Sequence, residues 1–380
     1  MENTVVIGAG ITGCFAAYFL ASRGLPVTII DPDGPGRQAS GNNPGGLNPF
    51  HGPGIPGPSL PLAIHAFQLH LQHQKTIASL SRQDAVIHRV TRIELAFNDA
   101  EAAALENVRR LYEEADGFSA NNLDRKELRQ EEPRCNKDAV AGLLMSGNGM
   151  IDSPVYTRAV CQAALRGGAR LIEERVRGIE TRDGKVHAVV TETGSLPCSA
   201  VVLATGPWME EPEEWLGVSI PVTPLKGQLL LAELPGDPLQ HHITHHANGV
   251  YRLPGGKVWL GGTLEHAGYD RTPTSEGRSK ILQETTRMLP CLKDCQIVGH
   301  VSALRPSTPD GLPVVGRVPG WNNVCVASGA GPKGMLLGPG LADGVVRLML
   351  GESQGFALEP FALERFNHSS NQTVRNPKVS

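Results

Sequence analysis

Three glycines with the spacing G-x-G-x-x-G lie near the start of this 380-residue chain and constrain its fold more than any other feature. The apolar run Thr4–Ile7 before them is typical of a buried strand, and the residues after them have helical periodicity. Gly8 allows a sharp turn, Gly10 allows the backbone to approach a pyrophosphate, and Gly13 allows the helix to pack on the strand. A strand on one side and a helix on the other make a chance cluster a poor explanation, so we predict a dinucleotide-binding βαβ unit.

An acidic residue follows at the distance that such a unit requires. The second predicted strand, 27–30, ends in Asp31, whose carboxylate is expected to accept hydrogen bonds from the ribose next to the adenine. The N-terminus of the intervening helix offers free N–H groups and a partial positive charge to the phosphates. The neighbouring residues Ile11, Thr12 and Pro32 are therefore predicted to contact the cofactor as well.

Composition limits the class of protein. Hydrophobic residues make up 40% of the chain and charged residues 19%, as in ordinary soluble proteins, and the length allows two domains. The net charge of −3 gives no electrostatic case for binding nucleic acid. The chain contains no apolar run of about 18 residues, so no transmembrane helix is predicted. The early first strand leaves no room for a signal peptide, and seven scattered cysteines are expected to be reduced thiols, so a cytoplasmic location is predicted.

Apolar periodicity gives a coarse map of the elements. Helices are expected at 62–82, 99–116, 122–134, 153–167, 275–289 and 335–350. The helix at 153–167 is predicted to begin with Ser153 as N-cap and Pro154 in the first position. Residues 169–192 are typical of a meander of β-hairpins, and 219–266 of an antiparallel sheet. Further strands are expected at 86–97, 139–151, 200–208, 296–304, 310–318 and 323–328.

These elements predict an α/β fold with two domains, of the α+β two-domain kind. A Rossmann-like nucleotide-binding domain is expected from 1–83, 146–217 and 301–365, which makes it discontinuous in sequence. An inserted antiparallel-sheet substrate domain is expected from 84–145 and 218–300. Residues 366–380 are predicted to be a polar, mobile tail.

Three motifs then resemble one family. They are GAGITG followed by Asp31, AVVLATGPW at 200–208, and LRPSTPDGLPVVGRVPGWNNVCVASGAGPKGMLLGP at 304–339. Together they are similar to the flavin-dependent amine and amino-acid oxidoreductases of the D-amino-acid oxidase and glycine oxidase superfamily. The similarity runs from Val5 to about Gly351. It implies FAD as the cofactor, so the Rossmann-like domain is expected to be FAD-binding.

The resemblance also implies which residues hold FAD. The family's loop under the flavin matches a loop after the second strand, and its adenine contact and isoalloxazine turn match later segments. A helix starting at Met335 would direct its N-terminus at the flavin edge that becomes negative on reduction, with Lys333 adding a charge unless it is an ordinary solvated loop lysine. The implied residues are Ser40, Gly41, Gly45, Gly46, Leu47, Val176, Gly206, Gly331, Lys333, Gly334 and Met335.

For the substrate, the resemblance implies a carboxylate held by Arg305 and capped by Tyr251. The alternatives are a structural arginine that bonds a loop carbonyl or Asp310, and a tyrosine of the core or sheet surface. Leu264 matches an apolar pocket residue. No side chain is expected to be catalytic, because hydride transfer to flavin N5 needs mainly positioning.

Two further features qualify this expectation. Pro332 stands near the place where glycine oxidases have a second arginine, which puts glycine itself in doubt and allows a larger or secondary amine. The four histidines of HHITHH (His241, His242, His245 and His246) could in principle hold a metal, but no ligand set is completed, and we expect pocket or surface histidines and no metal.

The predicted function is FAD-dependent oxidation of a CH–NH or CH–NH2 bond in a small amino acid or secondary amine. The imine product then hydrolyses, and electrons pass to O2 or another acceptor. The alternatives are the oxidase component of tRNA wobble-uridine modification, an amino-acid dehydrogenase that reduces a quinone or carrier, an NAD-dependent dehydrogenase, and a non-catalytic flavoprotein. The oligomeric state is left open, a homo-oligomer included.

Overall fold

The computed structural model describes residues 3–234 and 236–366. Of the tail predicted over 366–380, Phe366 is the last residue of a 3-10 helix, and the rest lies outside this range. Eight α-helices are found in the described part: α1 (Ile11–Ser22), α2 (Ser59–Ser81), α3 (Asp99–Glu113), α4 (Arg125–Glu131), α5 (Ser153–Arg166), α6 (Glu210–Leu216), α7 (Ser275–Met288) and α8 (Gly334–Leu350). Short 3-10 helices are η1 (Pro254–Gly256), η2 (Pro290–Asp294), η3 (Gly331–Lys333), η4 (Glu359–Phe361) and η5 (Leu363–Phe366).

A six-stranded sheet contains the predicted βαβ unit. Its order is β17-β18-β11-β1-β2-β7, and all neighbours are parallel except β17 and β18. Buried β-branched residues dominate the central strands, as expected where helices and loops cover both faces of a sheet. The bounds are β1 (Thr4–Ile7), β2 (Val27–Ile30), β7 (Arg170–Ile172), β11 (Ala200–Leu203), β17 (Val314–Arg317) and β18 (Val324–Ser328).

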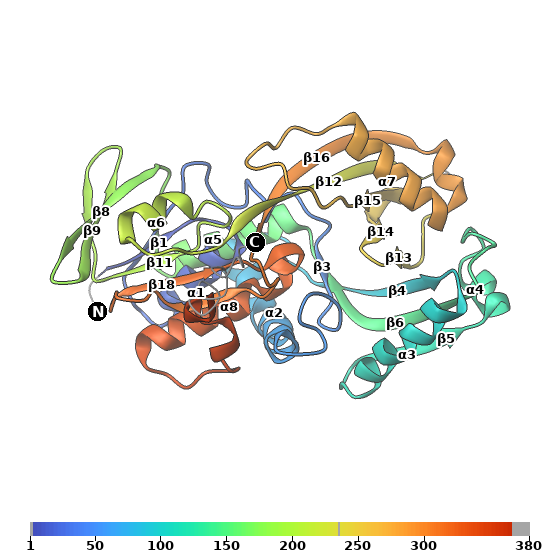
Figure 1. The fold of residues 1–380 in the computed structure, drawn as a ribbon, viewed down its shortest axis with the longest axis horizontal. Helices are drawn as coiled ribbons and strands as arrows, with labels where there is room; N and C mark the ends of the chain where they lie inside the picture. The colour runs from blue at the N-terminus through green and yellow to red at the C-terminus, as the bar shows by residue number, and fades with distance from the viewer. Residues whose placement is uncertain (1–2, 235, 367–380) are drawn as a thin grey trace, which may run out of the picture.

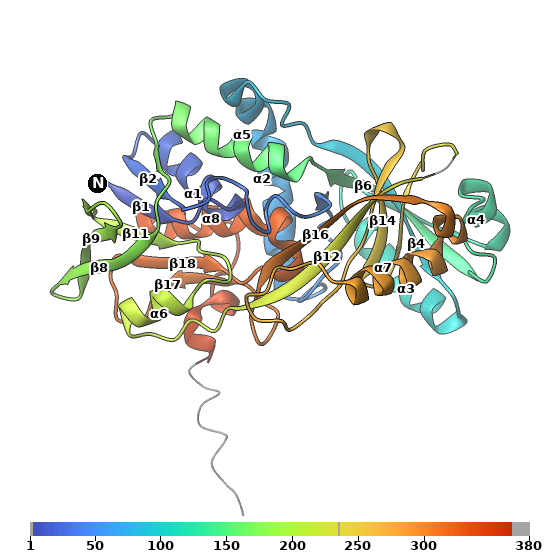
Figure 2. The same ribbon diagram turned by 90° about the horizontal axis from the view of Figure 1, so that it is seen from above.

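Helices α1, α2, α5 and α8 pack together beside this sheet. Figures 1 and 2 show them grouped with its strands, away from α3 and α4 at the other end of the molecule. Their shared core includes Phe15, Leu62, Tyr156 and Leu336, all at most 1% exposed. The first helix is therefore fixed on the N-terminal strand from several sides, which holds the glycine turn between them in place.

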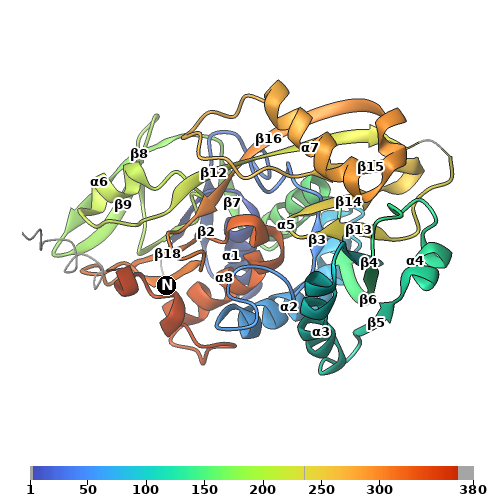
Figure 3. The same cartoon turned by 45° about the vertical axis from the view of Figure 1, so that its right-hand side comes forward.

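A second, nine-stranded sheet has the order β16-β12-β15-β14-β13-β4-β6-β3, with β5 also paired to β6. In Figure 3 it curves along the right-hand part of the molecule, with α7 over the β12 and β15 side and α3 against β5 and β6. The bounds are β3 (Gly46–Leu47), β4 (His88–Ala96), β5 (Ser119–Leu123), β6 (Ala141–Met150), β12 (Thr223–Glu233), β13 (His242–His245), β14 (Asn248–Arg252), β15 (Lys257–Gly261) and β16 (Gln296–Ser307).

The antiparallel pairing predicted for 219–266 is confirmed among its own strands, but the expected antiparallel substrate domain contains one parallel pair. Strand β13 pairs in parallel with β4, which comes about 150 residues earlier, with His242 opposite Arg92. The other pairings of β12, β13, β14 and β15 are antiparallel. A non-local pairing of this kind leaves no trace in local periodicity, because alternation looks the same for both directions.

Three local predictions also need correction. Strand β7 pairs with β2 in the six-stranded sheet, so of the predicted meander only the hairpin of β8 (Val176–Arg182) and β9 (Lys185–Thr191) is found. Strand β10 (Ser195–Pro197), which was not predicted, pairs with β9. The N-cap of α5 is Asp152, whose carboxylate accepts from Val155 N, because Ser153 already lies inside the helix. The helix expected at 122–134 shortens to α4, since the residues before it form β5.

All seven cysteines are free thiols in the structure. Across the described residues we find no helix with the length and apolarity needed to cross a bilayer. The division into two domains with the boundaries given above stays a prediction.

Candidate active site

The turn between β1 and α1 is shaped by glycines that no other residue could replace. Gly8 has φ +108°, and a Cβ built there would lie 2.3 Å from the carbonyl oxygen of Ala204. A Cβ at Gly13 would lie 1.9 Å from the carbonyl oxygen of Gly8. These contacts are with backbone, which cannot move aside, so the close approach of helix and strand depends on both glycines.

The N-terminus of α1 meets the loop after β2. Gly10 is the N-cap and offers no side-chain cap, while Ile11 N donates to the Ser40 Oγ at 3.0 Å. Gly41 is equally confined, because its Cβ would lie 1.9 Å from the carbonyl oxygen of Gly36. Backbone N–H groups at an uncapped helix N-terminus favour a bound phosphate. Ser40 therefore lies where the sequence places the pyrophosphate.

Asp31 holds two loops together. One carboxylate oxygen accepts from Ala9 N at 2.8 Å, and the other accepts from Asp33 N at 2.9 Å and Gly34 N at 3.0 Å. Burial raises the pKa of this carboxyl, and the three backbone donors oppose the rise. The sequence did not predict this structural role. A ribose contact from the same carboxylate stays a prediction.

A cavity of about 650 Å³ brings together all three residues predicted for the substrate and several of those predicted for the flavin. Its walls come from the loop after β2, the nine-stranded sheet, η3 and the start of α8. The predicted residues that line it are Ser40, Gly46, Tyr251, Leu264, Arg305, Gly331, Lys333, Gly334 and Met335. Those outside its lining are Gly8, Gly10, Ile11, Thr12, Gly13, Asp31, Pro32, Gly41, Gly45, Leu47, Val176 and Gly206.

The residues outside the lining are placed in different ways. Gly45 has φ +86° and contacts the backbone of Ile151 so closely that a Cβ would lie 1.9 Å from its oxygen. Leu47 is fully buried in β3, directly behind the wall formed by Gly46. Val176 begins β8 and packs with Val5 and Ile30 of the six-stranded sheet. They shape the fold around the cavity without facing it.

Arg305 projects from β16 across a neighbouring glycine. A Cβ at Gly227 would lie 1.9 Å from Arg305 Nη1 and 2.2 Å from Cζ, so the guanidinium occupies the space that any side chain there would need. Nη1 donates to the carbonyl oxygen of Thr263 at 3.0 Å. Burial lowers the pKa of Arg305, while Tyr251 and Glu265 raise it.

The two structural alternatives for Arg305 fare differently. The expected bond to a loop carbonyl is present, because Thr263 accepts from Nη1. The pairing with Asp310 is wrong, since Asp310 binds Arg365 at 2.8 Å. Among the described residues Arg305 has no acidic partner within 4.0 Å, so the rest of its guanidinium is available to a ligand.

Tyr251 projects from β14 and lies over Gly249, where a Cβ would be 2.5 Å from its Cζ. Its hydroxyl makes no hydrogen bond to any described residue. Burial raises the pKa of this hydroxyl, and the positive charges of Arg92 and Arg305 oppose that rise. The tyrosine thus lies within electrostatic reach of two arginines, of which the sequence predicted one.

Arg92 is the most important residue that the sequence analysis missed. It lies on β4, lines the cavity, forms an ion pair with Glu94 and donates from Nε to Thr244 Oγ1 at 2.7 Å. His51, from the loop after β3, lines the cavity too, and burial lowers its pKa to about 3. Arg92 and Glu94 are two residues apart and so share one face of β4, where opposite charges were a usable signal.

Lys333 is a cavity residue. Its Nζ donates to the carbonyl oxygen of Asn48 at 2.8 Å, and its methylenes lie against Gly52. Burial, with a smaller effect from the charge of Arg92, lowers the pKa of Lys333 to about 7. The alternative of an ordinary solvated loop lysine is therefore wrong.

Comparison with known proteins decides the family. Residues 3–348 match the family described as FAD dependent oxidoreductase. This chain belongs to that family. A glycine oxidase of Pseudomonas aeruginosa is 31% identical over 373 residues, covering 95% of this chain and 98% of that protein. A glycine oxidase of Pseudomonas putida is 28% identical and covers 96% and 98%.

A solved structure agrees with this assignment. The crystal structure of glycine oxidase from Geobacillus kaustophilus superposes with a TM-score of 0.89 at 25% identity, covering 96% of this chain and 99% of that one. The present chain is thus a FAD-dependent oxidoreductase that acts on the C–N bonds of amino acids or amines. FAD replaces the NAD cofactor of one sequence-based alternative.

The residues of this FAD-dependent oxidoreductase fit its cofactor. The glycine turn after β1 has backbone where side chains would collide, and the N-cap residue of α1, Gly10, has no side chain to cap the helix, although Ser40 Oγ accepts from Ile11 N. At the start of α8, Gly334 has open space where a Cβ would be, and the N-cap residue makes no side-chain cap bond. Two helix N-termini whose N-cap residues make no side-chain cap bond suit the pyrophosphate and the reducible end of a flavin.

The histidine-rich segment lies mostly outside the cavity. His241 hydrogen-bonds Thr91 Oγ1 at 2.7 Å, and His245 Nε2 lies 3.1 Å from Glu101. Only His246 of the four is in the cavity lining. The ligand atoms of His245, His246 and Glu101 lie within 4.8 Å of one another, but Glu101 also accepts from Phe97 N at the start of α3. The expectation of no metal stays a prediction.

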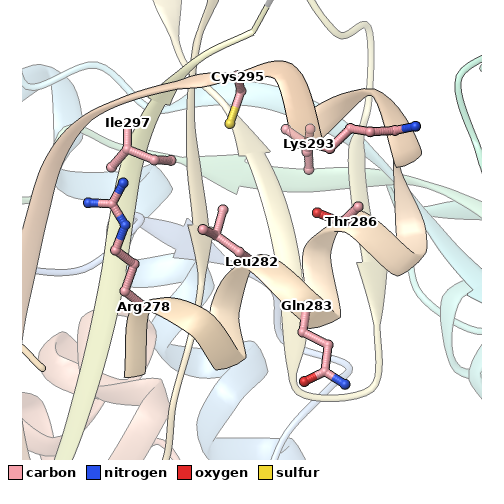
Figure 4. Close-up of a pocket in the computed structure, with 8 residues that line it drawn as sticks. Arg278, Leu282, Gln283, Thr286, Lys293, Cys295 and Ile297 are labelled. Carbon is pink, nitrogen blue, oxygen red and sulfur yellow. The ribbon is translucent and has the colours of Figure 1, made fainter. Parts of the chain in front are cut away.

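A second depression of about 560 Å³ lies between α7, η2 and β16. Figure 4 shows Leu282, Cys295 and Ile297 around it, with the Lys293 ammonium directed away. None of the residues predicted for the cofactor or the substrate lines this depression. The residues predicted for the substrate line the larger cavity instead.

Proposed function

We propose that this enzyme oxidises a small α-amino acid or N-substituted amino acid whose carboxylate is bound by Arg305 and Tyr251. One observation carries the proposal. An arginine without an acidic partner and a tyrosine with a free hydroxyl, among the described residues, line the same cavity as the η3–α8 turn. A planar guanidinium binds a carboxylate through paired charge-assisted hydrogen bonds, which are stronger than neutral ones.

The proposed reaction uses positioning. The α1 turn and the start of α8 would hold FAD, which when bound would supply the acceptor for a hydride from the substrate's α-carbon. The nitrogen lone pair then forms the C=N bond, an N–H proton passes to water, and water adds to the imine to release the oxo acid and the amine or ammonia. Two electrons leave in the same step, and we propose O2 as their final acceptor, with H2O2 as its product.

The protein's own residues set the geometry of this step. The carbonyl of Thr263 fixes the guanidinium of Arg305, which would bind the substrate carboxylate. The Tyr251 hydroxyl would donate a hydrogen bond to the same carboxylate. Leu229 and Leu264 give the cavity apolar lining, and of the two Leu229 is buried whereas Leu264 is exposed. No Asp or Glu is among the described residues that line it, so the amine must arrive neutral and no carboxylate base is available.

An anaerobic screen tests the proposal. The holoenzyme is mixed with glycine, N-methylglycine, both enantiomers of alanine, and the matched amines and amino-acid amides that lack a carboxylate. We expect loss of flavin absorbance with one or more acids and none with the matched compounds. Equal reduction by acids and amides would contradict the role of Arg305. Oxygen uptake compared with reduction of an added quinone identifies the acceptor.

A further inference from the structure

We propose that the preferred substrate is an amino dicarboxylic acid, whose second carboxylate is bound by Arg92 and Lys333. The inference rests on the proposed function and adds the substrate class to it. Three basic side chains line the cavity, namely Arg92, Arg305 and Lys333, and none of the described lining residues is an Asp or a Glu. One carboxylate on Arg305 leaves the other two cations without a ligand.

The order of strands separates the two cationic centres. Arg305 lies on β16 at one edge of the nine-stranded sheet, Tyr251 lies on β14, and Arg92 lies on β4 beyond β13. Tyr251 therefore lies between the two arginines, which agrees with the influence of both charges on its hydroxyl. A ligand that reaches both centres must carry an acidic group at each end.

Arg92 is held in place by an ion-pair partner that makes further hydrogen bonds of its own. Its ion-pair partner Glu94 is not in the cavity lining and also accepts from Thr244 Oγ1 at 2.6 Å and from His246 N at 2.8 Å. Arg92 uses Nε for Thr244 and Nη2 for Glu94. Its Nη1 makes no hydrogen bond within the described chain, so two N–H groups are left for a ligand.

Lys333 supplies the second cation of this centre. No acidic group of the described residues lies within 4.0 Å of Lys333 Nζ, whose hydrogen bond goes to the backbone of Asn48. Lys333 is half-buried and lines the cavity together with Arg92, whose charge contributes to lowering its pKa. A half-buried ammonium without an acidic partner is costly. A carboxylate bound between Lys333 and Arg92 would pair with both cations.

The ligand chemistry is then an acidic α-amino acid or an N-(carboxyalkyl)glycine. The bond changes are those of the proposed reaction: hydride from the α-carbon to FAD, the N–H proton to water, and hydrolysis of the resulting C=N bond. The second carboxylate takes no part in these changes. It contributes binding energy away from the reacting carbon, which can be used to orient that carbon.

Matched substrate pairs test the inference. Anaerobic flavin reduction is measured for N-methylglycine against N-(carboxymethyl)glycine, and for alanine against aspartate and glutamate in both enantiomers. We expect kcat/KM for the best diacid to exceed that of its monoacid by at least about tenfold, the size of one charge-assisted hydrogen bond. Reduction by monoacids with no gain for diacids would refute this inference and leave the proposed function intact. No reduction by any of these acids would refute both.

Two variants assign the preference to the residues. Lys333→Met keeps the aliphatic stem against Gly52 but removes the charge. The double variant Arg92→Met with Glu94→Gln removes the cation without leaving a buried carboxylate unpaired. In each, the diacid-to-monoacid ratio of kcat/KM should fall by about 10-fold or more. Lys257→Met, at an exposed lysine paired with Glu233 on β12, is the matched control and should keep the ratio.

A binding measurement separates substrate recognition from a role of Lys333 toward the cofactor. A non-oxidisable dicarboxylate without nitrogen, such as succinate, is titrated into the holoenzyme while the flavin spectrum is followed, with a monocarboxylate of equal length as reference. We expect the dicarboxylate to bind more tightly than the monocarboxylate. Lys333→Met should lower the affinity for the dicarboxylate at least about tenfold while the FAD content stays unchanged. Equal affinities for the two ligands, or a preference that survives both variants, would overturn the inference.

Discussion

Substituting Gly227 by alanine tests whether Arg305 binds the substrate carboxylate. The added Cβ would lie 1.9 Å from Arg305 Nη1, 2.2 Å from Cζ and 2.3 Å from Nη2, so the whole guanidinium must leave its position. It then loses the bond to the Thr263 carbonyl and its alignment with a substrate carboxylate. Losing one charge-assisted bond costs about 1.5–3 kcal/mol, which corresponds to about a 10- to 150-fold lower kcat/KM.

The assay is steady-state oxidation of the best carboxylate substrate, with flavin content and Tm measured in parallel. We expect the loss mainly in KM, because the anchor binds ground state and transition state alike. Gly178→Ala is the control, since a Cβ on that strand position meets no atom within 4 Å. If Gly227→Ala kept kcat/KM within about threefold of the wild type, well short of the tenfold that one such bond is worth, Arg305 would not be the anchor.

Three further predictions concern the cofactor turn and Lys333. Asp31→Asn places an NH2 group against one of the backbone donors of Ala9, Asp33 or Gly34. The free energy of unfolding of the FAD-free protein should therefore fall by about 1–3 kcal/mol, which lowers its Tm. An unchanged thermal melt would contradict this. Gly13→Ala forces α1 off β1, and the purified protein should carry little or no flavin, as its visible absorbance would report; a fully yellow variant would refute the close-approach argument. Because its pKa is lowered to about 7, Lys333 is charged below that pH and neutral above it. The Kd of a dicarboxylate should therefore rise between pH 6 and 9, and this rise should be absent in Lys333→Met. Arg92 stays charged over this range, and His51, whose pKa is about 3, stays neutral.

The sequence predicted those parts of the site that depend on local backbone requirements. The turn at Gly8 and Gly13 follows from sterics that only glycine satisfies, so its spacing is visible in one sequence. The convergence of Arg305, Tyr251 and the η3–α8 turn followed from motifs that the family resemblance placed together.

The remaining parts depend on contacts between distant segments. Arg92 enters the cavity because β4 pairs in parallel with β13, and nothing near Arg92 in the sequence specifies that pairing. The burial of Lys333 depends on the loop around Gly52, far away along the chain. The N-cap of α5 was misplaced by one residue because Asp152 and Ser153 are both good caps, and only tertiary packing chooses between them.

The parallel junction of β13 with β4 has a consequence for biosynthesis. Strand β4 leaves the ribosome early, but its neighbour in the sheet is made about 150 residues later, and β18 must still insert between β17 and β11 to complete the other sheet. If the η3–α8 turn holds the flavin as proposed, a nascent chain that stops short of α8 should bind neither flavin nor substrate. The yellow colour of bound flavin should therefore appear only after synthesis has passed that helix. A truncated product should be recognisable because it is colourless.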